Sequence, residues 1–175
     1  LPRFNASLCD TVRYGEAGSP DEPHDGREIL AQLERANLFV TPLDHRREWY
    51  RYHHLFADLL RYQLRVQEGE TRVLGLHRRA ARWFEQHCLV DDALFQYLAA
   101  KDTPAAASLV AEHAMLAFRR GDIHSAQKWL DALPEESIRS SHRLCLDIAW
   151  ICAVRDYYNQ MDKFVAATEA ALPGS

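Results

Sequence analysis

The 175-residue sequence lacks the short motifs that identify most nucleotide-hydrolysing, hydrolytic and zinc-dependent enzymes. It contains no Gly-x-x-x-x-Gly-Lys-Ser/Thr phosphate loop, no Gly-x-Ser-x-Gly nucleophile elbow and no His-Glu-x-x-His zinc motif. Each of these chemistries needs its residues at a fixed spacing, so their absence argues against catalysis. We therefore expect a non-enzymatic chain with no catalytic residues.

Cysteine is also sparse, with four residues in the chain. Cys9, Cys88, Cys145 and Cys152 form no Cys-x-x-Cys pair and no zinc-like spacing with histidine. Each lies in an apolar helical pattern, which predicts buried, reduced thiols. Reduced thiols indicate a cytoplasmic protein, and no metal site is predicted.

Long apolar runs and an excess of positive charge are missing as well. No run approaches the roughly 20 residues that a membrane span needs, and no signal peptide opens the sequence. The 21 Lys and Arg residues are outnumbered by 25 Asp and Glu residues. Nucleic-acid binding usually needs a clear positive excess, so neither membrane nor direct DNA contact is expected. The chain begins at Leu1 without a methionine, and we expect it to be a piece of a longer protein.

What the sequence does contain is a change of period within residues 49–60. Residues 49–52 alternate aromatic and charged side chains, the pattern of a short half-buried strand. From His53 onward the apolar residues follow helical spacing. An earlier apolar run and a polar turn complete a predicted two-stranded hairpin over residues 38–52.

Two helices are predicted before this hairpin, over residues 3–13 and 27–37. Asp25 and Glu28 have the spacing of a capping box at the start of the second one. Helix, helix, hairpin, helix is the order of a winged-helix domain without its first helix, and we assign it to residues 1–67. The helix at 27–37 lies where such domains read DNA, but its outward acids favour a packing role.

Residues 68–175 are predicted to form TPR-like antiparallel helical hairpins. The pattern Ala93-Leu94-x-x-Tyr97-Leu98 returns about 33 residues later as Ala126-x-x-Trp129-Leu130, and again around Met161. Trp83, Trp129 and Trp150 are expected to be packing residues. The predicted fold class is therefore mainly α: a partial winged helix (helices plus one β-hairpin) followed by TPR-like antiparallel helical hairpins. Stacked hairpins curve, and we expect their concave face to bind an inducer or a partner protein.

The switch from strand to helix falls on His53 and His54. A helix start offers unpaired backbone N–H groups and the positive end of the dipole, so anions bind there. A metal site would need a third ligand, and neighbouring helical residues are expected to point in different directions. His53 is either an anion contact or a structural residue that caps the helix or packs on the hairpin.

Several stretches resemble the MalT-like group of large ATP-binding LuxR-type transcriptional regulators, which belong to the wider class of signal-transduction ATPases. The resemblance covers nearly the whole chain and is carried by residues 33–40 (LERANLFV), 42–44 (PLD), 49–61 (WYRYHHLFADLLR), 76–85 (LHRRAARWFE) and 121–134. In that family an ATPase module precedes a winged-helix domain, a TPR-like superhelix follows, and a C-terminal helix-turn-helix binds DNA. The resemblance implies that this chain corresponds to the two middle parts.

The resemblance also implies a role for Tyr52-His53-His54. Signal-transduction ATPases carry a Met-His-Asp motif at the matching strand-to-helix switch, and its histidine contacts the ADP phosphate. His53 takes the histidine position, whereas Tyr52 and His54 replace the methionine and the aspartate. His53 is thus the implied nucleotide-phosphate sensor of the full-length parent, and Arg51 and His54 are secondary candidates.

On this reading the chain couples the nucleotide state of its parent to inducer or partner binding. It needs no cofactor of its own, ATP or ADP belongs to the parent, and the ATPase module of the same parent is its first partner. The alternatives are a TPR-type interaction adaptor without a nucleotide link and a winged-helix DNA-binding module.

Overall fold

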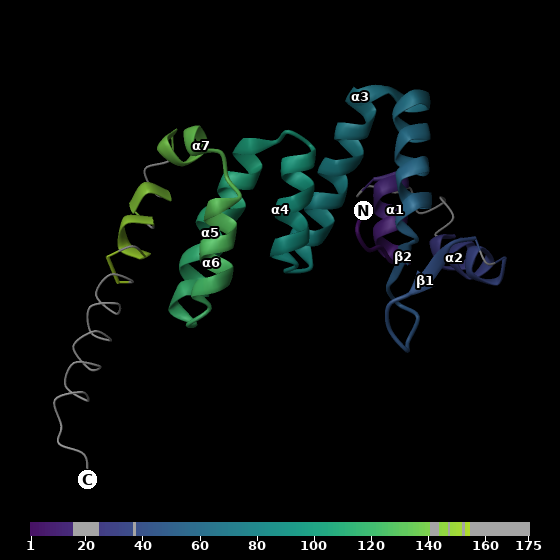
Figure 1. Cartoon of the computed structure of the whole chain (residues 1–175), viewed down its shortest axis with the longest axis horizontal. Helices are drawn as coiled ribbons and strands as arrows, with labels where there is room; N and C mark the ends of the chain where they lie inside the picture. Colours follow the sequence, from purple (N-terminus) through teal and green to yellow (C-terminus); the bar gives the residue numbers. More distant parts are fainter. Residues whose placement is uncertain (16–24, 37, 141–143, 147, 152, 155–175) are drawn as a thin grey trace, which may run out of the picture. The chain divides into compact units, whose positions relative to one another are not determined.

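The structure is a computed structural model that describes residues 1–15, 25–36, 38–140, 144–146, 148–151 and 153–154. This part of the chain is mainly helical and contains one two-stranded antiparallel sheet. It divides into two compact units, Leu1–Asp102 and a second unit that begins at Thr103. Figure 1 shows the elements of each unit along the chain. The predicted fold class is confirmed.

The first unit contains the helices and strands predicted for the winged helix, in the predicted order. They are α1 (Ala6–Tyr14), α2 (Gly26–Arg35), β1 (Val40–Pro42), β2 (Tyr50–Tyr52) and the first part of α3 (His54–Gln86). The same unit also contains α4 (Val90–Ala99), which lies in the stretch predicted as helical repeats.

The hairpin forms where the alternating pattern predicts it. Val40 pairs with Tyr52 and Pro42 with Tyr50, so Pro42 ends its strand, as its missing N–H requires. The Asp44 carboxylate closes the turn by accepting the N–H groups of Glu48 at 3.1 Å and Trp49 at 2.8 Å. These backbone hydrogen bonds lower the pKa of the Asp44 carboxyl. The turn is therefore built from local polar chemistry that the sequence already contains.

The predicted capping box at the start of α2 is wrong. Asp25 occupies the N-cap position, but its side chain makes no capping hydrogen bond. Its carboxylate lies 3.6 Å from the Arg13 guanidinium, and Asp10 of α1 accepts the N–H of Gly26 at 3.0 Å. A Cβ at Gly26 would stand 2.8 Å from the carbonyl oxygen of Ala6, so only glycine permits this approach. A neighbouring helix thus replaces the local cap.

The helix α3 consists of two arms that reverse direction at Gly69 (Figure 1). Gly69 has φ 74° and ψ 165°, a conformation that is essentially restricted to glycine. We call residues 54–68 the first arm and residues 70–86 the second arm. The domain boundary predicted at residues 67–68 lies beside this reversal, whereas the first compact unit continues to Asp102. The assignment of residues 68–102 to the repeat region stays a prediction.

Contacts far apart in sequence hold the N-terminal segment to the rest of the first unit. The Arg3 guanidinium pairs with Asp92 of α4 at 2.5 Å and lies over the ring of Trp49. The indole N–H of Trp83 donates to the Ser7 hydroxyl at 3.1 Å, and Trp83 is buried as predicted. The second arm of α3 therefore packs against the winged-helix elements as well as against α4.

Three successive helices end in the same backbone motif. This motif explains why Cys88, which was predicted to be buried, is exposed. Cys88, Lys101 and Gly121 have positive φ angles of 57°, 55° and 83°. After each helix a 6→1 and a 5→2 backbone hydrogen bond close a Schellman motif, for example from Leu89 N–H to the Phe84 carbonyl. Cys88 is exposed because it occupies this turn.

The expectation of buried thiols fails elsewhere too. Cys145 is exposed and Cys9 is only half-buried, so no described cysteine is fully buried. The three are free thiols, as predicted, and Cys152 lies outside the described residues.

The second unit begins with α5 (Thr103–Arg119), α6 (Ile123–Asp131) and α7 (Glu135–Ser140), and α5 packs against both other helices. Positions 33 residues apart in the predicted repeat are buried alike: Ala93 and Ala126 are inaccessible, and Tyr97 and Leu130 are both buried. The repeat around Met161 lies outside the described residues. Trp150 is 60% exposed, so its predicted packing role is wrong in this structure.

Candidate phosphate-sensing site at the start of helix α3

The junction of β2 and α3 fixes the backbone of His53. Its N–H donates to the carbonyl of Phe39, the residue before β1, at 2.8 Å, and this bond connects the helix start to the hairpin. Its own carbonyl accepts the N–H of Ala57 at 2.9 Å, the first hydrogen bond of the helix. His53 therefore occupies the N-cap position, with φ −56° and ψ 137°. Two backbone hydrogen bonds set where its side chain can point.

The side chain of His53 is exposed and makes no capping hydrogen bond. Its ring lies against that of His54, with 4.4 Å between the centroids and 35° between the planes. The expectation that the two rings diverge is therefore wrong. The N-cap residue has non-helical dihedral angles, so the spacing rule for helix interiors does not apply to this pair.

The surroundings of the pair are favourable to an anion. The first turn of α3 contains no acidic residue, and its leading N–H groups carry the positive end of the helix dipole. Asp58, one turn further, pairs with Arg61 at 2.6 Å. Arg51 lies two residues before His53, on the exposed side of β2. The three predicted site residues, Arg51, His53 and His54, thus all present accessible side chains on one short stretch of chain.

An aromatic cluster packs against the junction of β2 and α3. The ring of Phe56 lies 5.1 Å from Phe39 and 5.7 Å from Tyr52, measured between centroids. Tyr52 in turn lies 4.7 Å from the ring of Phe4, which is buried. Packed aromatic pairs of this kind restrict rotation of the elements that carry them. The start of α3 is therefore held by side chains as well as by backbone.

The first arm of α3 also carries a feature that the sequence reading missed. Four of its apolar side chains recur at helical spacing on one exposed face: Leu55 (68% exposed), Leu59 (50%), Tyr62 (68%) and Val66 (66%). We call these four residues the exposed α3 stripe. Exposed apolar clusters of this kind mark interaction surfaces. The helical spacing of these four residues can be seen in the sequence. Which face of the helix stays exposed depends on tertiary packing, which the spacing does not predict.

Other kinds of site find no support in the described residues. Among them, no cluster of three or more His, Cys, Asp and Glu side chains could bind a metal ion. Within the same ranges, no helix is long and apolar enough to cross a membrane.

These features define a class: a winged-helix-type domain, with its hairpin ending at a helix start, followed by a helical region. Residues 1–73 match the family model of the MalT winged helix domain. The resemblance to MalT-like regulators that the sequence predicted is thereby confirmed.

Whole-sequence comparison leads to the same regulators. The chain is 29% identical over 150 residues to the HTH-type transcriptional regulator MalT of Cronobacter sakazakii, covering 86% of this chain and 16% of the relative. It is 29% identical over 148 residues to the MalT of Serratia proteamaculans, covering 85% of this chain and again 16% of the relative. The chain thus spans about a sixth of the length of the curated relatives it matches.

Proposed function

We propose that this chain is an internal, non-catalytic segment of a MalT-like, ATP-dependent transcriptional regulator, and that it couples nucleotide state to inducer or partner binding. The match of residues 1–73 to the MalT winged helix domain supports the first part. The exposed ring of His53 at the start of α3 is the single observation that carries the second part.

His53 is the proposed contact to the phosphate of ADP bound in the ATPase module of the parent. A histidine that capped its own helix would accept a backbone N–H through one ring nitrogen and would be held against the helix start, whereas the His53 ring makes no such bond. An N–H donated to a phosphate oxygen, together with the helix dipole, is worth about 1–3 kcal/mol. The fixed backbone at Phe39 and Ala57 lowers the entropy lost when the contact forms.

Arg51 and His54 have secondary roles in this proposal. The exposed guanidinium of Arg51 adds positive charge near the phosphate. Because Arg51 is exposed, salt screens its attraction to the phosphate more than it would screen that of a buried group. The ring of His54 packs against that of His53 and holds its orientation. Neither residue substitutes for the N–H that His53 donates.

The ATPase module of the parent is the proposed partner of the exposed α3 stripe. The stripe begins at Leu55, two residues after His53, so a module that presents ADP to His53 would cover it. In the resting protein, ADP and this apolar contact would together hold the winged-helix domain closed. An inducer or partner protein binds the helical repeats from about residue 71 onward and shifts the population toward the open, active state.

Other properties follow from the same proposal. The protein is cytoplasmic, ATP and ADP bind to its parent, and promoter DNA is bound elsewhere in the parent. The exposed acid Glu28 of α2 opposes a DNA backbone and supports the absence of direct DNA contact, whereas Glu34 pairs with Arg47 of the hairpin turn.

Hydrogen exchange in the full-length protein tests the coupling. The first N–H groups of α3, at residues 54–56, have no acceptor in their own helix and exchange quickly when exposed. With ADP bound they should exchange at least tenfold more slowly, whereas the hairpin turn at residues 44–47 should be unchanged. Unchanged exchange at residues 54–56, with ADP bound at saturation, would contradict the proposal.

A further inference from the structure

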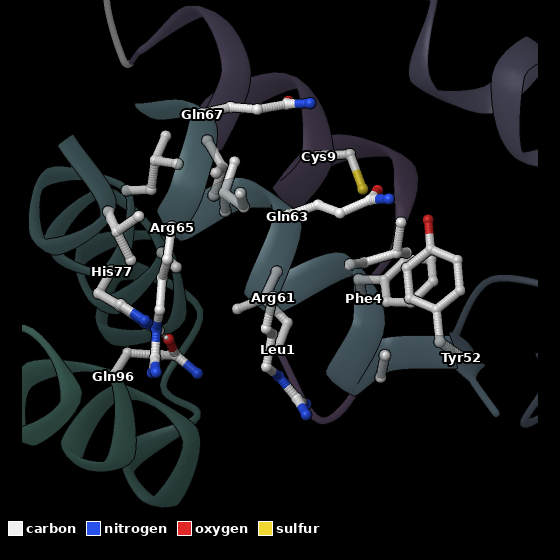
Figure 2. A pocket seen from close by; sticks show the side chains of 17 residues that line it. Leu1, Phe4, Cys9, Tyr52, Arg61, Gln63, Arg65, Gln67, His77 and Gln96 are labelled. Atoms are coloured by element: carbon white, nitrogen blue, oxygen red, sulfur yellow. Dashed lines mark hydrogen bonds between the residues drawn. The ribbon is translucent and has the colours of Figure 1, made fainter. Parts of the chain in front are cut away.

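The first unit contains a pocket of about 430 Å³ whose lining does not include His53. It lies among α1, both arms of α3 and α4 (Figure 2). A volume of this size suits a small organic molecule. Its walls are largely apolar and include Phe4, Val12, Leu60, Leu64, Val73 and Leu76.

At one end of the pocket lies a buried amide without a full set of hydrogen bonds. Gln96 of α4 is completely buried, and its Oε1 lies 2.7 Å from His77 Nδ1. Its Nε2 has no hydrogen-bond partner among the described residues. Buried amide groups are nearly always hydrogen-bonded, because leaving a donor unmatched costs free energy. Gln96 is one of the residues that line the pocket, and in Figure 2 its amide lies beside the ring of His77.

The placement of Gln96 is the reverse of what hydropathy favours. The neighbouring residue Phe95 is 57% exposed, whereas Gln96 has no accessible surface. A helix turned to bury Phe95 would avoid the unmatched amide. A polar side chain at this buried position is therefore explained by a binding partner more readily than by packing.

A second hydrogen-bond donor approaches the same end. Arg65 of the first arm lines the pocket, and in Figure 2 its side chain runs toward His77 and Gln96. Arg61, one turn earlier, also lines the pocket but pairs with Asp58 at 2.6 Å. No ion pair of Arg65 occurs within the described ranges of the chain. The end of the pocket thus offers an amide N–H and a guanidinium.

We propose that this pocket binds a small amphipathic carboxylate, with its apolar body between the two arms of α3 and its carboxylate on Gln96 and Arg65. A carboxylate accepts hydrogen bonds from both donors and balances the charge of Arg65. The apolar lining takes an alkyl or aryl body rather than a sugar or a nucleotide. His53 does not line this site, and the proposal does not depend on the function proposed above.

Occupancy of the pocket would act on the reversal at Gly69. The ligand contacts Leu60 and Leu64 of the first arm, and Val73 and Leu76 of the second. A molecule that touches both arms stabilises the arrangement in which they lie together, by as much as its affinity differs between arrangements. The ligand therefore stabilises the first unit and tightens the link between the winged-helix elements and α4.

The test uses sodium decanoate as the probe and 1-decanol as its uncharged counterpart, titrated into the intact protein by calorimetry. Decanoate should bind with a Kd of roughly 0.1 mM, an affinity expected for a ligand of this size. Decanol should bind roughly tenfold more weakly, because it cannot accept a charge-assisted hydrogen bond from Arg65. Decanoate should also slow alkylation of Cys9, which lines the same pocket.

Two variants locate the carboxylate. Gln96→Leu keeps the volume but removes both the unmatched donor and the hydrogen bond to His77, and the variant should bind decanoate roughly tenfold more weakly. Gln86→Leu, at an exposed position of the second arm, is the matched control and should bind as wild type does. If Gln96→Leu does not fold, Arg65→Gln at an exposed position replaces it, with the same expected loss.

Three results would overturn the proposal. They are the absence of saturable decanoate binding, equal affinities for decanoate and decanol, and undiminished decanoate binding by the Gln96→Leu and Arg65→Gln variants.

Discussion

The rings of His53 and His54 lie 4.4 Å apart, at an angle of 35°, at the first residue of α3 and the residue before it. Both are exposed, so the pair forms one accessible surface. A change at either ring alters the surroundings of the other. Effects of substitutions at these two positions are therefore expected to be non-additive.

The reversal of α3 should require glycine at residue 69 only because of the backbone conformation at that position. No heavy atom lies within 4 Å of a Cβ added at Gly69, so replacement costs backbone strain without a clash. Gly69→Ala should lower the free energy of unfolding by about 1–3 kcal/mol. Gly75 lies in the helical second arm, with equally open space. Gly75→Ala should raise stability by about 0.5–1 kcal/mol. Denaturant unfolding of both variants checks this, and a loss of similar size at both positions would contradict it.

Cysteine reactivity should follow burial. Burial is the main cause that raises the pKa of the Cys9 thiol to about 11, and the charge of Asp10 adds to it. The thiolate is the reactive form, so Cys9 should alkylate roughly 100-fold more slowly at pH 8 than exposed Cys88. The Cys9 rate should then rise about tenfold per pH unit up to its pKa. Mass spectrometry of iodoacetamide-labelled peptides measures both rates, and equal rates at pH 8 would contradict the assignment.

The exposed α3 stripe should matter only in the full-length protein. Tyr62→Ser removes an exposed side chain, so the thermal stability of the chain should change little. If the stripe contacts the ATPase module, the same change should raise inducer-free transcription by roughly tenfold, the effect of losing an interface anchor. Gln86→Ser, another exposed position of α3, is the control. Wild-type basal transcription with Tyr62→Ser would exclude the stripe as that contact.

Local patterns predicted the elements well, because local chemistry determines them. The alternation of residues 49–52 and the turn closed by Asp44 specify the hairpin within a few residues of chain. The change of period at His53 predicts the start of α3, and the structure begins α3 at His54 with His53 as its N-cap residue.

Errors arose where distant residues or backbone conformation decide the outcome. Asp10 in α1, rather than Asp25, supplies the acceptor at the start of α2. Cys88 is exposed because a Schellman turn follows the helix, which its apolar neighbours do not reveal. The burial of Gln96 was not predicted, because a polar side chain gives no hydropathy signal for a buried position.

The candidate site could also be predicted only in part. Its position on the chain was predictable, but the closeness of the rings of His53 and His54 depends on side-chain torsions that no spacing rule contains. The phosphate role of His53 stays a prediction until it is measured.

The most direct measurement is the ADP affinity of the full-length protein with His53→Ala, His54→Ala and, as control, His45→Ala. His45 is an exposed histidine in the hairpin turn, away from the start of α3. His53→Ala should weaken ADP binding at least tenfold, as expected from a loss of about 1.4 kcal/mol or more. His54→Ala should weaken it by about twofold to fivefold through the lost ring contact, and His45→Ala should have no effect. Wild-type ADP affinity in a correctly folded His53→Ala protein would contradict the account and leave His53 a structural residue.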